Sequence, residues 1–313
     1  AAANKLNKLG HKITVYEKNE VFGGLLSLGI PDFKLEKNIV ERRISFLQAE
    51  GITFKANVNV GVDIDISEMQ KKYDSIILCG GAEKPRDLQI QGRELGGIEF
   101  AMDFLTQQNR RNGEREILGE AISAKNKKVV IIGGGDTGSD CIGTSIRQGA
   151  KSVINLELLP KPPETRLGNN PWPEWAQINR TSTSHEEGCE RIFSVLTKEF
   201  IGKNGKLKKL KIKQISFTKK REIVEVPNSE FELEADLVIL ALGFTGVNTN
   251  GLIDNSEILL NENGQVKSEN NYMTNVKGIF TAGDMRTGQS IVVRAINDGR
   301  NVAEKVHQYL LTI

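Results

Sequence analysis

The sequence predicts an α/β protein made of two doubly wound units with parallel sheets, one inserted in the other. The first observation is the stretch VVIIGGGDTGSD at residues 129–140, where an apolar strand runs into a glycine loop and a helical segment. The second is a pair of similar strands, YDSIILCGGA at 73–82 and ADLVILALGF at 235–244, which both end on small residues. Continuous apolar runs are typical of parallel strands covered on both faces. We therefore expect two Rossmann-like nucleotide-binding domains.

The composition is that of a globular protein with no global attraction to nucleic acid or membranes. The 313 residues, 38% of them hydrophobic, are enough for two cores of ordinary domain size. Lys and Arg total 42 against 40 Asp and Glu, which leaves a net charge of only +2. No apolar run approaches the roughly 20 residues that cross a bilayer, so we expect a soluble protein.

Three cysteines, Cys79, Cys141 and Cys189, lie far apart in the sequence without a CxxC pair. This spacing excludes a dithiol redox centre, a cysteine zinc site or a cluster motif within the chain. Thiols without a disulfide framework are typical of a reducing compartment. We therefore expect no metal site in this chain and a cytoplasmic location.

The start of the chain repeats the segment that follows the glycine loop. In AAANKLNKLGHKITVYEK, a helix ends at Gly10 and a β-rich run ends at Glu17. In SDCIGTSIRQGAKSVINLELL, the matching positions are Gly149 and Glu157. Only the second copy is preceded by its own strand and loop. We therefore expect an N-terminally truncated first domain, which lacks its first strand and its GxGxxG motif.

These repeats set the predicted domain boundaries. We assign residues 1–110 and 246–313 to a discontinuous outer domain, and residues 111–245 to an inserted domain. The outer domain is expected to close with the strand GIFTAGD and a helix from about Ser290 to Leu310.

Two other stretches have a recognisable character. VFGGLLSLGIPDFKL at residues 21–35 is too rich in Gly and Pro for regular structure, and Gly23 and Gly24 would permit close backbone approach to a ligand. KNGKLKKLKIKQISFTKKR is typical of a hairpin that turns at Asn204 and Gly205. We interpret its lysines as solvated, because a nucleic-acid surface would need more stacking side chains than its single Phe.

The central glycine loop predicts a dinucleotide site. Gly133 allows a tight turn, Gly135 lets the backbone approach a pyrophosphate, and Gly138 lets the helix pack closely on the strand. The helix N-terminus that follows presents free N–H groups to phosphates. Asp136, which directly follows Gly135, fits either a cap of the loop or helix start or a ligand contact.

An acidic residue marks the predicted ribose position. Glu157 stands nineteen residues after Gly138, at the end of the next strand, where a carboxylate hydrogen-bonds a ribose diol and opposes a 2′-phosphate. This position favours NADH. Lys161 and Arg166 lie near enough in the sequence to bind a 2′-phosphate, so NADPH stays an alternative. Glu17 takes the matching place in the first domain.

The stretch GIFTAGDMRTGQSIVVRAINDGRNVA, residues 278–303, favours a flavin site. Asp284 ends a buried strand and can meet the ribityl chain or a phosphate, and a helix begins near Ser290. The positive end of that helix would face the pyrimidine edge of the flavin and stabilise its reduced form. An ordinary strand, turn and helix would explain the same pattern, so both interpretations stay open.

Taken together, these stretches resemble the small (beta) subunit of glutamate synthase and the equivalent C-terminal region of the NADH-dependent enzyme. The resemblance runs over nearly the whole chain. It is carried by GGLLSLGIPDFKL, GAEKPRDLQIQGRELGGIEFAMDFL, IIGGGDTGSDCIGTSIRQGAKSVINLELLPKPPETR, NPWPEW, SHEE, EADLVILALGF and AGDMRTGQSIVVRAINDGR.

The resemblance implies a fold like that of glutathione reductase, with FAD in the outer domain and NADH or NADPH in the inserted one. It implies that hydride passes from nicotinamide C4 to flavin N5 between stacked rings, with no essential side-chain acid or base. Electrons would then pass through iron–sulfur clusters, held by the missing N-terminal region or the partner, to the large (alpha) subunit or domain. There L-glutamine and 2-oxoglutarate become L-glutamate, as in an oxidoreductase acting on CH–NH2 donors in ammonia assimilation.

The resemblance also assigns site residues in this sequence. The positions that match the FAD-contacting pattern are Glu17, Gly23, Gly24, Leu25, Lys34, Val60, Gly81, Gly283, Asp284, Gln289, Ser290 and Ile291. The positions that match the nicotinamide-dinucleotide site are Gly133, Gly135, Asp136, Thr137, Gly138 and Glu157.

The chain departs from the family pattern at several flavin positions. Arg286 and Thr287 stand where paired arginines usually precede GQS, and Arg294 replaces a Trp of the last helix. The strand motif often written Ala-Thr-Gly is here CGG, residues 79–81. We expect altered local flavin contacts and weak FAD binding by this chain alone.

Other functions are compatible with parts of the pattern. A related ferredoxin or sulfide-type NAD(P)H reductase module, or the reductase half of dihydropyrimidine dehydrogenase, would share the fold, although LELLPKPPETR and NPWPEW argue against both. A disulfide reductase would need paired cysteines near the flavin. A binding or assembly module that kept the fold without turnover is the alternative from another class, because fold alone does not prove activity.

Overall fold

The computed structural model describes residues 1–174 and 176–313, so Trp175, the last residue of NPWPEW, lies outside the described residues. The chain separates into two compact units, each made of discontinuous segments. Unit 1 contains Ala1–Ser27, Glu36–Arg86 and Gly243–Ile313, and unit 2 contains Leu28–Leu35 and Asp87–Leu242.

These boundaries differ from the predicted ones. The inserted segment was expected to begin at residue 111, but unit 2 begins at Asp87 and also takes in Leu28–Leu35. The reason is strand pairing: β5 (Ile98–Phe100) pairs in parallel with β12 (Leu237–Leu240) of unit 2. No glycine loop follows β5, so the sequence offers no signal that this strand joins the second sheet.

Unit 2 is built on a five-stranded parallel sheet in the order β5-β12-β6-β7-β8. Successive side chains of each central strand point to opposite faces. In β6, Val130 and Ile132 enter one buried core and Val129 and Ile131 enter another, so the run VVII is covered on both faces. The elements of this layer are β6 (Lys128–Ile132), β7 (Ser152–Glu157), β8 (Glu190–Phe193), α5 (Ala101–Asn112), α6 (Asp136–Arg147) and α7 (Thr183–Glu186).

The two faces of this sheet are covered by different structures. Phe104 of α5 and Ile142 of α6 are fully buried in the core on one side. On the other side, Phe200 and Leu210 are buried, and they belong to a three-stranded antiparallel sheet in the order β11-β10-β9. Its strands are β9 (Val195–Lys203), β10 (Lys206–Phe217) and β11 (Ile223–Glu234).

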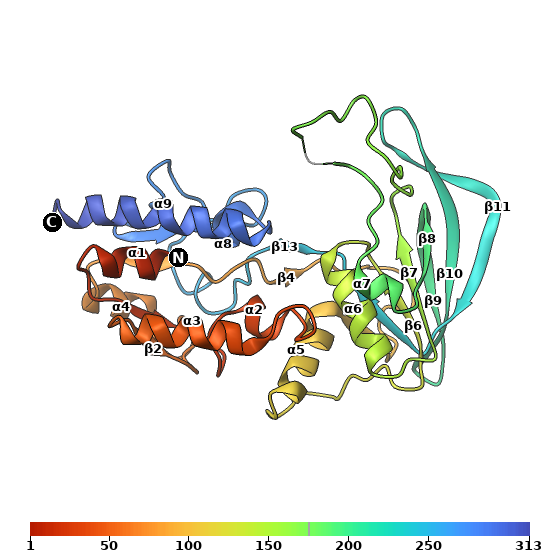
Figure 1. The fold of residues 1–313 in the computed structure, drawn as a ribbon, viewed down its shortest axis with the longest axis horizontal. Helices are drawn as coiled ribbons and strands as arrows, with labels where there is room; N and C mark the ends of the chain where they lie inside the picture. The colour runs from red at the N-terminus through yellow and green to blue at the C-terminus, as the bar shows by residue number, and fades with distance from the viewer. Residues whose placement is uncertain (175) are drawn as a thin grey trace. The chain divides into compact units, whose positions relative to one another are not determined.

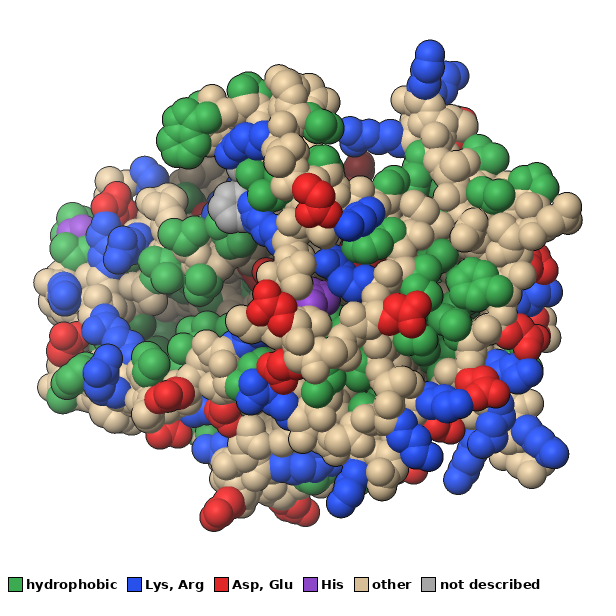
Figure 2. Space-filling model, turned by 45° about the vertical axis from the view of Figure 1, so that its right-hand side comes forward, with side chains coloured by type: hydrophobic (Ala, Val, Ile, Leu, Met, Phe, Trp, Pro, Cys, Tyr) green, Lys and Arg blue, Asp and Glu red, His purple; other side chains and the backbone are tan. Residues whose placement is uncertain are grey.

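The predicted lysine-rich hairpin is confirmed. Asn204 and Gly205, with φ of 53° and 73°, connect β9 to β10 in the left-handed conformation that suits a two-residue hairpin turn. The lysines of β10 are solvated, and several pair with glutamates of β11, as Lys209 does with Glu232 at 2.9 Å. On the face drawn in Figure 2, basic and acidic side chains are likewise intermixed. The sequence pattern did not predict these acidic partners.

Unit 1 carries its parallel strands in two separate pairs, β1 with β2 and β3 with β14. In β14, Ile279 and Phe280 enter two different buried cores, as expected for a strand covered on both faces. The second of these cores joins α1 to α9 through Leu6 and Val302, and Figure 1 shows the two helices side by side. The predicted helix ending before Gly10 and the predicted last helix are both confirmed.

The remaining elements of unit 1 are short. The stretch at residues 21–35 contains a four-residue helix, α2 (Leu25–Leu28), so the prediction that it holds no regular structure is wrong. Among the described residues, no helix combines the length and apolar character that a membrane crossing requires. The elements not yet placed are α1 (Ala2–Lys8), β1 (Thr14–Tyr16), α3 (Lys37–Ala49), β2 (Thr53–Lys55), α4 (Ile66–Lys72), β3 (Ile76–Leu78), β4 (Lys84–Pro85), β13 (Phe244–Gly246), β14 (Ile279–Thr281), α8 (Asp284–Thr287) and α9 (Val292–Leu310).

Candidate nucleotide-binding sites

The glycine loop of unit 2 lies where the strand order of the parallel sheet reverses. From β6 the chain continues to β7 on one side, whereas β12 lies on the other side. Gly133 follows β6 with φ of 122°, and a Cβ at this position would stand 2.2 Å from the carbonyl oxygen of Ala241, just after β12. Open α/β sheets bind ligands in the crevice at such a point, at the carboxyl ends of the strands.

The helix after this loop begins without a side-chain cap. Gly135 is the N-cap of α6 and makes no side-chain cap hydrogen bond. Asp136 is the acidic residue of the first helical turn, and its side chain is exposed, whereas Thr137 is half-buried. The first N–H groups of a helix have no partner within the helix, and with the helix dipole they favour an anion.

The third glycine of the motif permits close packing within the loop. A Cβ at Gly138 would stand 2.3 Å from the carbonyl oxygen of Gly133, whereas nothing lies within 4 Å of a Cβ at Gly135. Gly138 is therefore required by the fold. Gly135 is left open on the side where a ligand would approach.

Glu157 ends β7 beside the loop, and it carries a partner that the sequence did not reveal. Arg191 of β8 donates to Glu157 Oε1 through Nη2 at 2.7 Å and through Nε at 3.2 Å. The two basic residues proposed as ligands of a 2′-phosphate have local partners: Lys161 pairs with Glu164, and Arg166 donates to the carbonyl oxygen of Asn170. The only signal for Arg191 is its place on the strand next to β7.

A second missed residue is Asn155, which is fully buried in β7. Its Nδ2 donates to the carbonyl oxygens of Gly133 at 2.9 Å and Ile131 at 3.2 Å, so it ties the end of β6 to β7. The sequence did offer a signal for this residue, since Asn155 is a polar residue inside the apolar run VINLEL. A buried amide side chain is normally hydrogen-bonded, so its presence there indicates a specific partner.

A chain of polar side chains crosses the start of α6. Lys34 Nζ donates to Ser139 Oγ at 3.2 Å, Ser139 Oγ lies 2.6 Å from Ser182 Oγ, and Ser182 Oγ lies 2.7 Å from His185 Nδ1. Burial, with the charges of Arg191 and Lys34, lowers the pKa of His185 to about 4. Lys34 is thus the FAD candidate that belongs to unit 2, whereas the other eleven belong to segments of unit 1.

In unit 1, two candidate turns meet at one edge of the β3–β14 pair. Leu78 and Thr281 are register partners, so the loop through Gly81 and the turn at Gly283 both leave the carboxyl ends of parallel strands. Gly283 has φ of 70° and its N–H donates to Asp298 Oδ2 at 2.7 Å. The two loops therefore leave the same edge of this strand pair.

The Gly283 turn is held by an ion pair that the sequence analysis missed. Arg286 Nε donates to Asp298 Oδ2 at 3.0 Å, and its guanidinium lies 4.4 Å from the centre of the Tyr272 ring. Burial alone would raise the pKa of Asp298, but Arg286 and the Gly283 N–H together hold it below its ordinary value. Arg286, which stands in the pair of positions before GQS where only Thr287 is not an arginine, therefore has a local structural partner.

Asp284 is the residue of unit 1 that fits a ligand best. Its Oδ1 is buried and has no hydrogen-bond partner among the described residues. Burial raises the pKa of its carboxyl group, against an opposing contribution from Ser290. A buried oxygen without a partner is costly, and a ribityl hydroxyl would supply the missing hydrogen bond. This observation fits a flavin.

The other FAD candidates are dispersed over unit 1. Glu17 follows β1, and its Oε1 accepts hydrogen bonds from Asn19, at 2.9 Å from the backbone N–H and 2.7 Å from Nδ2. Gln289 Nε2 donates to the carbonyl oxygen of Phe244 at 3.1 Å. The remaining candidates divide into exposed residues, Gly24, Leu25, Ser290 and Ile291, and half-buried ones, Gly23 and Val60.

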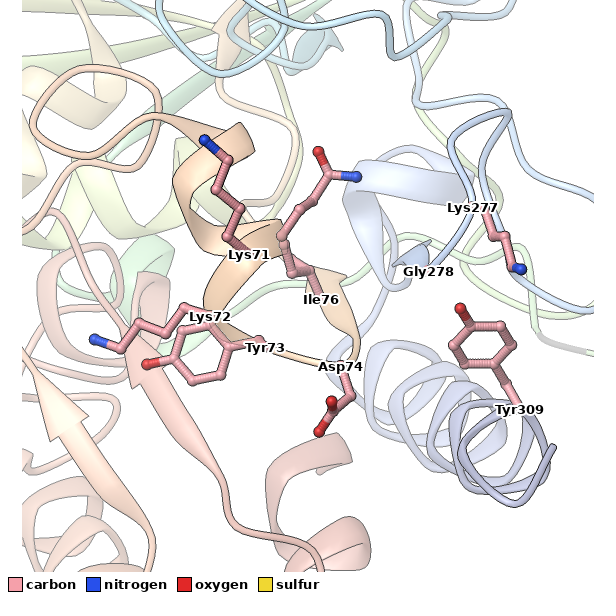
Figure 3. Close-up of a pocket in the computed structure, with 9 residues that line it drawn as sticks. Lys71, Lys72, Tyr73, Asp74, Ile76, Lys277, Gly278 and Tyr309 are labelled. Atoms are coloured by element: carbon pink, nitrogen blue, oxygen red, sulfur yellow. The ribbon is translucent and has the colours of Figure 1, made fainter. Parts of the chain in front are cut away.

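A polar cavity of about 270 Å³ in unit 1 lies at the opposite edge from the candidate turns. It is lined near the starts of β3 and β14, and Figure 3 shows Lys71 and Lys72 on one side, with Lys277 and Tyr309 on the other. Because nucleotides bind at the carboxyl ends of parallel strands, this cavity is not the candidate nucleotide site. Within the described part of the chain, no group of three or more His, Cys, Asp or Glu side chains is placed to hold a metal ion.

The fold and the two glycine turns define a class of protein with paired dinucleotide-binding units. The chain belongs to the pyridine nucleotide-disulphide oxidoreductase family, whose model matches residues 1–299. It is similar in fold to Mycobacterium tuberculosis FprA in complex with NADPH, with a TM-score of 0.76 and 16% identity over 99% of this chain and 82% of that one. It is likewise similar in fold to T. acidophilum thioredoxin reductase, with a TM-score of 0.65 and 19% identity over 99% of this chain and 94% of that one. The predicted fold class is confirmed.

The resemblance drawn from the motifs is confirmed by curated relatives. The chain is 45% identical to the glutamate synthase [NADPH] small chain of Mycobacterium tuberculosis, over 99% of this chain and 64% of that protein. It is 41% identical to the glutamate synthase [NADH] of Saccharomyces cerevisiae, over 99% of this chain and 15% of that protein. The chain therefore spans less than two thirds of the length of these relatives.

Proposed function

We propose that this chain is the NAD(P)H-oxidising flavoprotein part of a glutamate synthase. Unit 1 would hold FAD and unit 2 would hold the nicotinamide dinucleotide; when bound, the dinucleotide supplies hydride and the flavin accepts it. The observation that carries the proposal is the buried Oδ1 of Asp284, at the start of α8 just after β14, which has no hydrogen-bond partner among the described residues. It is found in a chain whose other unit has a glycine loop followed by the uncapped helix α6. A strand and turn that bind no ligand would not leave a buried carboxylate oxygen without a hydrogen-bond partner.

The residues of unit 2 would bind and orient the dinucleotide. The backbone N–H groups at the start of α6 would donate hydrogen bonds to the pyrophosphate. The residues proposed for this contact are Gly135, Asp136, Thr137 and Gly138. Glu157 would accept a hydrogen bond from the ribose diol, which favours NADH over NADPH because a carboxylate opposes a 2′-phosphate. The names of the relatives support either dinucleotide, since one is [NADPH] and the other [NADH].

The residues of unit 1 would bind FAD. Asp284 would meet the ribityl chain, Gly81 and Gly283 would allow the backbone to approach it, and Glu17 would face the adenosine ribose. The further FAD contacts that we propose are Gly23, Gly24, Leu25, Lys34, Val60, Gln289, Ser290 and Ile291. Lys34 would act from unit 2, where it now contacts Ser139.

The whole reaction would need a partner. We propose that electrons pass through iron–sulfur clusters outside this segment to a large subunit or domain, which makes L-glutamate from L-glutamine and 2-oxoglutarate. The similarity to proteins named as small chains supports this. Free thiols at Cys79, Cys141 and Cys189 support a cytoplasmic location. Co-purification of the full-length chain with a large glutamine-using subunit would test it.

The decisive experiment is spectroscopic. The full-length polypeptide is purified, its visible spectrum is recorded for bound flavin, and it is titrated anaerobically with NADH and, separately, with NADPH. We expect a flavin spectrum that bleaches with at least one dinucleotide, and with less NADH than NADPH. A protein that binds flavin yet bleaches with neither dinucleotide would end the reductase proposal.

A further inference from the structure

The ion pair between Glu157 and Arg191 lies beside the glycine loop and is largely hidden from solvent. The side chains are only 13% and 15% exposed, and the shortest distance between them, Nη2 to Oε1, is 2.7 Å. Solvent and salt screen a pair in this setting less than an exposed one. The ribose end of the loop therefore carries one negative and one positive charge, where an acidic residue alone would leave a net negative charge.

The two oxygens of Glu157 are used differently. Both hydrogen bonds from Arg191 end on Oε1. The other oxygen, Oε2, lies against the loop, since a Cβ at Gly134 would stand only 2.0 Å from it. Arg191 thus leaves Oε2, the oxygen next to the glycine loop, out of its two hydrogen bonds.

Arg191 is held in place independently of Glu157. Its Nη1 donates to the carbonyl oxygen of Arg180 at 3.1 Å and to Asn179 Oδ1 at 3.4 Å. Its guanidinium also lies 4.8 Å from the centre of the Phe193 ring, within range of a cation–π contact. Removal of the carboxylate would therefore leave a positioned guanidinium beside the loop.

We propose that Arg191 determines which dinucleotide this site prefers. With Glu157 ionised, Arg191 acts as a positioning residue that presents Oε2 to the ribose diol of NADH. With that carboxylate removed, the same guanidinium becomes the ligand of the 2′-phosphate of NADPH, to which an Arg fork binds as a bidentate donor. The inference rests on the proposed function of unit 2 and adds to it a residue that no motif marks.

The test compares Glu157→Gln, Arg191→Gln and the double variant in the full-length flavoprotein. The first measurement is kcat/KM for NADH and for NADPH, with ferricyanide as electron acceptor. We expect Glu157→Gln to raise the ratio of kcat/KM for NADPH to kcat/KM for NADH by at least about tenfold, as the replacement of one charged contact would. The double variant should not show this increase in the ratio, and Arg191→Gln alone should lower kcat/KM for NADH.

The second measurement needs no hydride transfer. Binding of 2′,5′-ADP, which carries the 2′-phosphate but no nicotinamide, is followed by calorimetry. Glu157→Gln should bind it at least about tenfold more tightly than the unaltered protein, and the double variant should not. If the proposed redox function failed while this pattern held, the assignment of Arg191 would still stand.

A matched control is available in the same unit. Glu187 pairs with Arg147, whose Nη2 donates to its Oε1 at 2.9 Å, at the far end of α6 from the glycine loop. Glu187→Gln makes the same chemical change there and should alter neither the kcat/KM ratio nor the binding of 2′,5′-ADP. Equal behaviour of Glu157→Gln and Glu187→Gln, or a double variant that keeps the NADPH gain, would overturn the inference.

Discussion

The two glycine turns that follow buried parallel strands are fixed by different means. At Gly133 in unit 2, a Cβ would stand 2.2 Å from a backbone oxygen of Ala241, so close backbone packing requires glycine. At Gly283 in unit 1, the nearest atom to such a Cβ is 3.9 Å away, in Ala295. There the positive φ requires glycine, and the side chain of Asp298 fixes the turn.

This difference indicates how each turn would recognise a ligand. The turn of unit 2 is lined by backbone and by an uncapped helix start, which suits a phosphate group. The turn of unit 1 depends on the carboxylate of Asp298, which accepts the Gly283 N–H, and it is followed by Asp284, whose Oδ1 is buried without a hydrogen-bond partner among the described residues. Removal of one carboxylate side chain should therefore lower the stability of unit 1 more than that of unit 2. A methyl group added at a glycine should instead lower the stability of unit 2 more.

The largest effect is expected at Asp298. Its replacement by Ala removes the acceptor of the Gly283 N–H and leaves the partly buried Arg286 guanidinium without its partner. We expect a loss of about 3 kcal/mol in the free energy of unfolding, because a half-broken buried ion pair costs more than a lost surface pair. Urea unfolding followed by circular dichroism would measure it.

The control for this change is Asp298→Asn, which keeps one oxygen for the Gly283 N–H while it removes the charge. Its loss should be smaller than that of the Ala variant, and FAD should still bind. If the Ala variant unfolded at the same urea concentration as the unaltered protein, the comparison between the two turns would be wrong for unit 1.

A smaller effect is expected when a methyl group is added in unit 2. Gly138→Ala would place a Cβ 2.3 Å from the carbonyl oxygen of Gly133, so we expect a loss of about 1–3 kcal/mol from overpacking. Gly135→Ala, with φ of −81° and nothing within 4 Å, should leave stability unchanged. It should still weaken dinucleotide binding, because the added methyl group stands on the open side of the loop.

The measurements are urea unfolding and fluorescence titration with NADH on both variants. We expect Gly138→Ala to lower stability and Gly135→Ala to lower the affinity for NADH, because Gly138 is needed for packing and Gly135 for the approach of the ligand. A Gly135→Ala protein that is stable and binds NADH with unaltered affinity would contradict the assignment of this loop to the pyrophosphate.

The sequence predicted features that depend on local spacing. The glycines of the central loop, the hairpin turn at Asn204 and Gly205, and the strand before Gly283 were all found, because each conformation needs particular residues at fixed positions. The parallel strands were found because burial on both faces leaves a continuous apolar run.

The sequence did not predict contacts between residues that only the fold brings together. Asp298 meets Gly283 from fifteen residues away, and Arg191 meets Glu157 from 34 residues away on the next strand. The boundary at Asp87 was missed for the same reason, since β5 joins unit 2 by strand pairing alone. Charged side chains are common on any surface, so no pattern distinguishes those that pair across strands.

The smallest effect is expected from pH in the polar chain beside the loop of unit 2. His185 Nδ1 accepts the Ser182 N–H at 3.2 Å, and burial, with Arg191 and Lys34, lowers its pKa from 6.5 to about 4. Below pH 6.5 the unfolded chain takes up a proton that the folded one refuses, so stability falls as pH drops from 6.5 toward 4. Because the imidazole is only half-buried, solvent screening keeps its contribution to the slope well below the limit of about 1.4 kcal/mol per pH unit. Thermal unfolding at several pH values should show a shallower decline in His185→Gln than in the unaltered protein, and identical slopes would mean that this histidine titrates normally.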